Sequence, residues 1–285
     1  MANRTRRKIE LYAIHAHETR TFTYDRLFEA LSKIPAPQRV FDVHGYVVGF
    51  PVVAKYRGGY FIQATEGDPD AAALVFDRST GQTRETDLRG SEVLSQATHM
   101  FVSPEERRAS IEYVRRGVKA VMLGPAIEGV LSQNIQELRR LRIEFTPRTT
   151  EDFVREIQEF ERIRLAAIRI TKPNASWTDH YTQLSELMDD SRGEKVEIDV
   201  RAGRGESLKK NSGIVRVIKQ VANDDQPYLD EAIITGTRTN ETTETTIRAS
   251  QHIQHTRVSV DSDEAGVPLQ QSIRSALTDF LNRFI

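Results

Sequence analysis

Apolar and polar residues alternate near the start of the chain, with the two-residue period of a β-strand. Within residues 8–17 the alternate positions hold Ile9, Leu11 and Ala13, which predicts a half-buried strand. From 22 to 34 the apolar spacing changes to that of a helix, which Pro35 ends. Further strands are expected at 40–50, 59–65, 97–102 and 109–115, with a helix as the alternative for the charged segment at 109–115. A hairpin over 74–87 is expected to turn at 79–81.

The middle of the chain mixes helical and strand periods. After Gly124 and Pro125, apolar residues recur at helical spacing, so a helix with proline near its first position is expected. A strand at 141–145, a helix opened by Thr149 with Asp152 in a capping-box pattern, and a strand at 165–171 follow. These three segments predict a β-α-β unit of the ferredoxin-like kind.

The rest of the chain predicts more strands between helices. The expected elements are a helix from Ser176 through Leu187, a strand at 196–200, a helix at 208–222, antiparallel strands over 228–260 with a turn at 239–241, and a final helix opened by Pro268. The apolar stripe of the final helix is expected to pack on its own domain, with a dimer interface as the alternative.

Together these segments predict an α+β protein with two domains of mixed, largely antiparallel sheet and packed helices. Residues 1–120 are expected to form an N-terminal sheet-rich domain. Residues 121–285 are expected to form a C-terminal domain that includes the β-α-β unit, a basic helix, a β-rich tail and the amphipathic final helix.

Composition narrows the class of protein. Lys and Arg number 40 against 41 Asp and Glu, so no overall positive charge points to a nucleic-acid partner. Cys is absent, which removes disulfides and thiolate chemistry and fits a reducing compartment. The start of the chain is too polar for a signal sequence, and no apolar run is long enough for a membrane span. A cytoplasmic protein is therefore expected.

The search for catalytic groups finds only weak candidates. His15 with His17 would share a strand face, whereas His252 and His255 would face opposite sides, and neither pair completes a metal-ligand set. A glycine-rich segment at 203–205 lacks the ending of a phosphate-binding loop and is more typical of an ordinary turn. The carboxylates Glu197 and Asp199 leave a metal-dependent nuclease as a minor alternative. Neither an enzyme, a cofactor nor a metal site is expected.

Charge is distributed unevenly along the chain. Residues 201–220 contain six basic residues against one acid, Glu206, whereas 223–285 contain ten acids against five arginines. On a helix over 208–222, Lys209, Arg216 and Lys219 project opposite the apolar face. Such a stripe suits binding to a phosphate backbone, and a solvated helix face is the alternative. The candidate DNA-binding residues are Arg201, Arg204, Lys209, Lys210, Arg216 and Lys219, joined by Arg115, Arg116 and Lys119.

Four blocks carry a resemblance to a known family: RIEFTPRTTEDFVREI at 142–157, LAAIRITKPN at 165–174, MFVSPEERRASIEYVRRG at 100–117 and MLGPAIEGVLSQNI at 122–135. They resemble the RexA-like phage-exclusion proteins of temperate phages. The similarity is patchy, covers roughly residues 97–212 and includes no catalytic motif.

The resemblance implies a two-domain homodimer that binds double-stranded DNA without strong sequence preference. It also implies a part in superinfection exclusion and in the lysis-lysogeny decision, together with a RexB-like membrane-protein partner encoded nearby. The matched blocks contain no binding signature, so the DNA-contacting residues above rest on charge alone. A protein-protein adaptor or regulator in phage defence is the alternative from another class.

Overall fold

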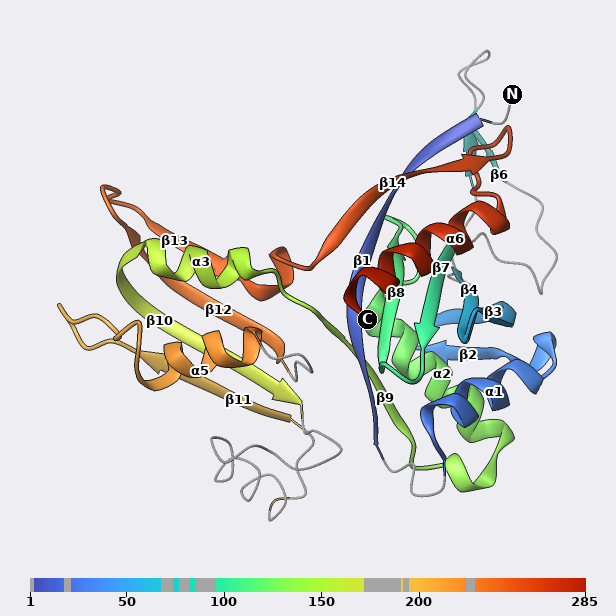
Figure 1. The fold of residues 1–285 in the computed structure, drawn as a ribbon, viewed down its shortest axis with the longest axis horizontal. Coiled ribbons are helices and arrows are strands. Elements are labelled where there is room, and N and C mark those ends of the chain that lie inside the picture. The colour runs from blue at the N-terminus through green and yellow to red at the C-terminus, as the bar shows by residue number, and fades with distance from the viewer. Residues whose placement is uncertain are drawn as a thin grey trace. The chain divides into compact units, whose positions relative to one another are not determined.

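Figure 1 shows the computed structural model of the protein, which describes residues 3–17, 22–67, 74–76, 83–85, 96–171, 191, 195–223 and 229–285. The chain forms two compact units, each assembled from separated segments. Unit 1 comprises Met1–Ile9, Ala16–Phe145 and Arg257–Ile285, and unit 2 comprises Glu10–His15 and Thr146–Thr256. This division differs from a boundary at residue 120, because 121–145 and the final helix pack within unit 1.

The larger sheet has eight strands and lies mainly in unit 1. Across the sheet the strands are β14 (His255–Ser262), β1 (Asn3–His17), β8 (Arg108–Tyr113), β7 (Gln96–Ser103), β4 (Gly59–Gly67), β3 (Tyr46–Tyr56) and β2 (Val40–Val43), and β9 (Arg142–Pro147) also pairs with β1. The pairs from β8 through β2 are antiparallel. A separate antiparallel hairpin joins β5 (Leu74–Phe76) to β6 (Thr83–Glu85), and its expected turn lies outside the described residues.

Helices cover both faces of this sheet. They are α1 (Tyr24–Lys33), α2 (Ala120–Asn134) and α6 (Gln270–Leu281). Successive residues of a strand point to opposite faces. On one face the ring of Tyr60 lies 5.9 Å from that of Phe28 in α1. On the other face Ser110 Oγ donates to the Leu277 carbonyl of α6 at 2.9 Å. The apolar stripe of α6 therefore packs within its own unit.

Unit 2 is a four-stranded antiparallel sheet with helices on one face. The strand order is β11 (Lys195–Arg201), β10 (Phe160–Thr171), β12 (Leu229–Arg238) and β13 (Glu244–Arg248). The helices α3 (Glu151–Glu159) and α5 (Gly213–Ala222) cover the apolar face (Figure 1). Phe153, Phe160, Ile168, Ile218 and Ile234 are buried between the two layers. Each such side chain contributes about 1.5–3 kcal/mol when it leaves water.

The α+β class with antiparallel sheets is confirmed, but the expected β-α-β unit is not formed. The strand β9 pairs with β1 in the larger sheet, whereas β10 lies at the centre of the four-stranded sheet. Both neighbours of β10 run antiparallel to it. A strand, a helix and a strand do follow one another in sequence, yet the two strands belong to different sheets. Periodicity identifies strands without identifying their partners.

The helix expected to open at Pro125 begins earlier. Pro125 lies inside α2, which starts at Ala120. The N–H that Pro125 lacks would have bonded to the carbonyl of Val121 in the first turn, where Val121 is 75% exposed. Gly124 has a packing role, because a Cβ there would lie 2.1 Å from the Ile143 carbonyl oxygen of β9. The Gly-Pro pair therefore allows close contact between α2 and the sheet.

The capping box expected at Thr149 is also absent. Thr150 is the N-cap of α3, without a side-chain capping bond. The hydroxyl of Thr149 instead donates to the carbonyl of Ala222 at the end of α5, at 2.9 Å. A tertiary hydrogen bond between the start of α3 and the end of α5 thus replaces the local cap that the sequence pattern suggested.

Two further elements are shorter than expected. The segment at 40–50 is a hairpin, because His44 and Gly45 both have positive φ and turn the chain between β2 and β3. The helix expected at 208–222 begins only at Gly213.

The expected helix at 176–187 lies outside the described residues. Among the described helices, none combines the length and apolar character that crossing a bilayer requires.

Candidate anion-binding pocket

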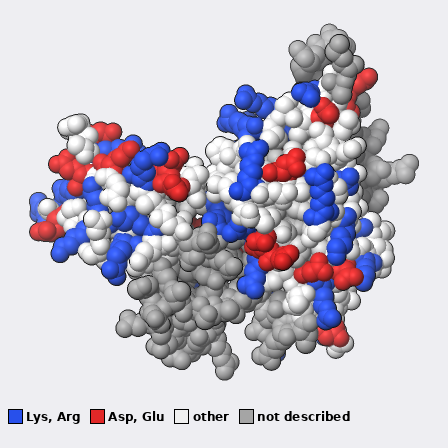
Figure 2. Space-filling model, viewed as in Figure 1, with Lys and Arg blue, Asp and Glu red and all other residues white. Residues whose placement is uncertain are grey.

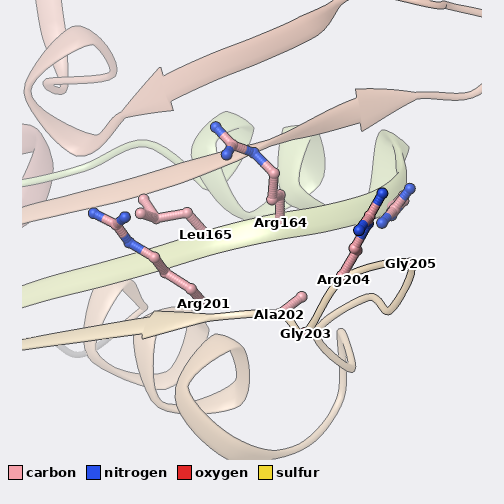
Figure 3. A pocket seen from close by; sticks show the side chains of 8 residues that line it. Arg164, Leu165, Arg201, Ala202, Gly203, Arg204 and Gly205 are labelled. Carbon is pink, nitrogen blue, oxygen red and sulfur yellow. The ribbon is translucent and has the colours of Figure 1, made fainter.

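Four arginines line a pocket at one end of the unit 2 sheet. Its volume is about 400 Å³, and it is lined by Arg162, Arg164, Leu165, Arg201, Ala202, Gly203, Arg204 and Gly205. Figure 3 shows Arg164 and Arg201, from the two strands, and Arg204, from the loop after β11, extending to the same side. All four guanidinium groups belong to exposed residues. The pocket is therefore basic and open to solvent.

The pairing of β10 with β11 brings these arginines together. Leu165 is the register partner of Arg201, so the start of β10 lies beside the end of β11. Burial alternates along β10, with Ile163 in the core and Arg164 exposed. Burial also alternates along β11, where Val196 and Ile198 contact the core. The pocket therefore forms on the side of the sheet away from α3 and α5.

The segment after β11 closes the pocket against β10. The amide of Ala202 donates to the Arg164 carbonyl at 2.9 Å, and the amide of Leu208 donates to the Ile163 carbonyl at 2.9 Å. Between them the chain turns at Gly205, whose φ is +84°, a conformation that favours glycine. Two backbone bonds and one glycine turn thus hold the 202–206 loop in place.

The four arginines differ in their ion-pair and hydrogen-bond partners. Arg164 is paired with Glu244, with Nε and Oε1 2.6 Å apart. Arg162 Nε donates to the Glu206 carbonyl at 3.0 Å. Within the described part of the chain, Arg201 and Arg204 have neither an ion-pair partner nor a side-chain hydrogen bond. A guanidinium keeps its charge at any physiological pH, so the pocket has a net positive charge.

The basic residues counted at 201–220 are spread over two sides of unit 2. Arg201 lies on the open face of the sheet, whereas Arg216 is exposed on α5, which covers the other face. Lys210 Nζ donates to the Gln158 carbonyl of α3 at 2.9 Å. Lys219 donates to Asn211 Oδ1 at 2.8 Å. Burial, and then the charge of Lys210, lower the pKa of Lys219. Lys209 precedes α5 and is exposed.

The second expected cluster lies in unit 1, between β8 and α2. Arg115 and Arg116 are exposed there. Lys119 Nζ donates to the carbonyls of Val114 at 2.5 Å and Arg115 at 2.7 Å. It also lies 4.9 Å from the ring centroid of Tyr113. Lys119 is therefore used within unit 1, where it fastens the segment that leads into α2.

Two arginines of the pocket, Arg162 and Arg164, were not among the candidates from the sequence. Their signal was present, because two basic residues two positions apart on a strand share a face. Their contribution depends on the register with β11, which the sequence alone did not show. The local excess of charge at 201–220 identified the other half of the pocket, Arg201 and Arg204.

The weaker candidates are engaged in other contacts. Glu197 Oε2 accepts from Arg169 Nη2 at 2.9 Å and is half of an ion pair on the open face. His252 packs against the ring of Phe153 with centroids 5.6 Å apart, and it lies in a turn instead of the expected strand. Across the described ranges, no three His, Asp or Glu side chains lie together as metal ligands would.

Charges of both signs occur together on the face of the protein shown in Figure 2. Basic side chains are interspersed with acidic ones over both units in this view. A broad field of one sign is absent from the described surface in that view.

Comparison with known proteins assigns no ligand to this pocket. No protein-family model and no curated protein matches the sequence. The resemblance to the RexA-like proteins therefore remains a prediction from the quoted sequence blocks. The chemical interpretation of the pocket depends on its own residues.

Proposed function

We propose that the protein binds double-stranded DNA through its phosphates, without strong base preference, and that the arginine pocket of unit 2 is a principal contact. The observation that carries this proposal is the convergence of four arginines on one pocket, three of them without an acidic partner among the described residues. An anion that enters the pocket can contact several of these guanidinium groups at once.

Phosphate is the anion that this donor set suits. Arginine presents planar pairs of N–H groups that match two phosphate oxygens at once. Contacts to phosphate position a protein on DNA without reading the bases. Arg216, on α5, is exposed on the other side of the unit 2 sheet, so it belongs to a separate contact surface. This set of groups supports affinity more than sequence specificity.

The resemblance to the RexA-like proteins supplies the proposed setting. There the protein would act as a homodimer in superinfection exclusion, with a membrane protein encoded nearby. Its support is the sequence blocks at 100–117, 122–135, 142–157 and 165–174. Expression of the chain with and without its neighbouring genes, followed by plating of unrelated phages, tests this setting. Equal plating efficiency in all strains would count against it.

DNA binding itself is tested by fluorescence anisotropy with three unrelated duplexes of equal length at several salt concentrations. We expect similar affinities for all three, and a linear fall of log K with log salt. The absence of binding at low salt, or tight binding that ignores salt, would contradict phosphate recognition.

Two sets of variants separate the possible contact surfaces. Replacing Lys209, Arg216 and Lys219 together by Glu tests the stripe expected from sequence, and Arg201→Ala with Arg204→Ala tests the pocket. We expect both sets to weaken binding to all duplexes alike, because neither surface reads bases. Unchanged affinity in one set would remove that surface from the contact area.

A further inference from the structure

We infer that the arginine pocket recognises a phosphomonoester, the dianionic phosphate at the end of a nucleic-acid strand or on a free nucleotide, in preference to an internal phosphodiester. This inference rests on the proposed function, which assigns phosphate to the pocket. It adds which kind of phosphate the pocket takes.

The first argument is shape. The pocket is concave, with a volume of about 400 Å³, within the range of small-molecule sites. Its walls come from two segments, β10 on one side and the end of β11 with its loop on the other. An internal phosphodiester continues into a sugar at two of its oxygens, so protein groups reach it from one side. A terminal phosphate continues into one sugar only, and guanidinium groups can surround its three free oxygens.

The second argument is charge. Glu244 neutralises Arg164, which leaves Arg162, Arg201 and Arg204 as the unneutralised cations of the pocket wall. A phosphodiester brings one negative charge, whereas a phosphomonoester brings about 1.5 to 2 at neutral pH. The dianion compensates the cluster more completely.

The third argument is the backbone of the 202–206 loop. The amides of Ala202 and Glu206 donate within the protein, to Arg164 and Gly203 respectively. In the described structure, the amides of Gly203, Arg204 and Gly205 donate to no protein acceptor. These three residues line the pocket. A Cβ on Gly205 would meet nothing within 4 Å, so the loop leaves room for an anion close to its backbone at this residue.

The experiment compares two versions of one duplex, one with 5′-phosphates and one with 5′-hydroxyls, each labelled at a 3′ end. Anisotropy titrations at fixed salt give the affinity of the full-length protein for each. We expect the phosphorylated duplex to bind about tenfold more tightly, the factor that one charge-assisted hydrogen bond supplies. We also expect Arg201→Ala with Arg204→Ala to abolish the difference. Arg204→Lys, which keeps the charge and loses the planar fork, should reduce the difference in part.

Two further measurements show whether the pocket takes a free nucleotide as well as a DNA end, and whether the protein binds DNA that has no ends. Adenosine monophosphate is added as a competitor, with adenosine as its control, and a relaxed closed-circular plasmid provides DNA without ends. Competition by the monophosphate alone supports the phosphomonoester site. Equal affinity of the two duplexes, together with no competition by the monophosphate, overturns the inference. In that case, binding to the plasmid would still support the proposed function. Binding of the monophosphate without binding of any DNA would support the pocket and overturn the proposed function.

Discussion

Removing Arg201 and Arg204 together is expected to flatten the salt dependence of DNA binding. Neither side chain has an ion-pair partner among the described residues, so their loss exposes no unpaired acid and leaves no buried group unsatisfied. Both are exposed, on the end of β11 and its loop. The fold should therefore survive the double substitution, and a change in binding can be attributed to the lost charges.

The size of the effect follows from counterion release. Each phosphate contact contributes about 0.9 to the slope of log K against log salt, so two lost contacts make the slope shallower by about 1.8. Between about 50 and 200 mM salt, the wild-type protein should then lose about 12-fold more affinity than the variant. The ratio of the two affinities should be greatest at the lowest salt.

The assay is anisotropy of one labelled duplex across that salt range. A matched control, Arg139→Ala with Arg140→Ala, removes the same charge from two exposed residues of unit 1. If net charge alone governed binding, both variants would have the same slope. A pocket variant with the wild-type slope would refute the assignment of phosphate contacts to Arg201 and Arg204.

Three other predictions concern stability and are checked by urea denaturation. Arg39 is 8% exposed, and its Nε and Nη1 have no hydrogen-bond partner. Arg39→Met should therefore raise the free energy of unfolding by about 1–3 kcal/mol, and a loss of stability would contradict this reasoning. Gly236→Ala should cost about 1–3 kcal/mol, because its Cβ would lie 2.1 Å from the Arg162 carbonyl oxygen, and an unchanged midpoint would contradict this packing. Glu112→Ala should cost about 3–5 kcal/mol, because the buried Glu112 is 2.6 Å from His99 Nδ1; a cost below 1 kcal/mol would show that the pair contributes little.

Local elements were largely predictable from the sequence because their signals are local. Alternation identified β1 and β11, and Pro35 marked the end of α1. Gly124 and Pro125 were expected to mark a helix start, but they lie inside α2. Gly124 serves a tertiary contact instead, because it allows α2 to approach the Ile143 carbonyl closely. Thr149 misled for a similar reason, since its hydroxyl bonds to the end of α5. A residue selected for a distant contact can resemble a local start signal.

The candidate site was half predictable. The charge excess at 201–220 included Arg201 and Arg204, which line the pocket. The same count included Lys210, whose ammonium group is bonded to an α3 carbonyl. Arg162 was missed, because the pairing of β10 with β11 is a long-range property of the fold. Local composition therefore located a basic region without showing which side chains share one surface.

Heteronuclear NMR of the arginine Nε–Hε groups in the complex with a short duplex tests the central claim most directly. Spectra of the Arg201→Ala and Arg204→Ala proteins assign the two resonances. Phosphate binding in the pocket predicts that both shift on titration with DNA and that they recover as salt is raised. Shifts confined to other arginines, with these two unmoved at saturating DNA, would contradict it.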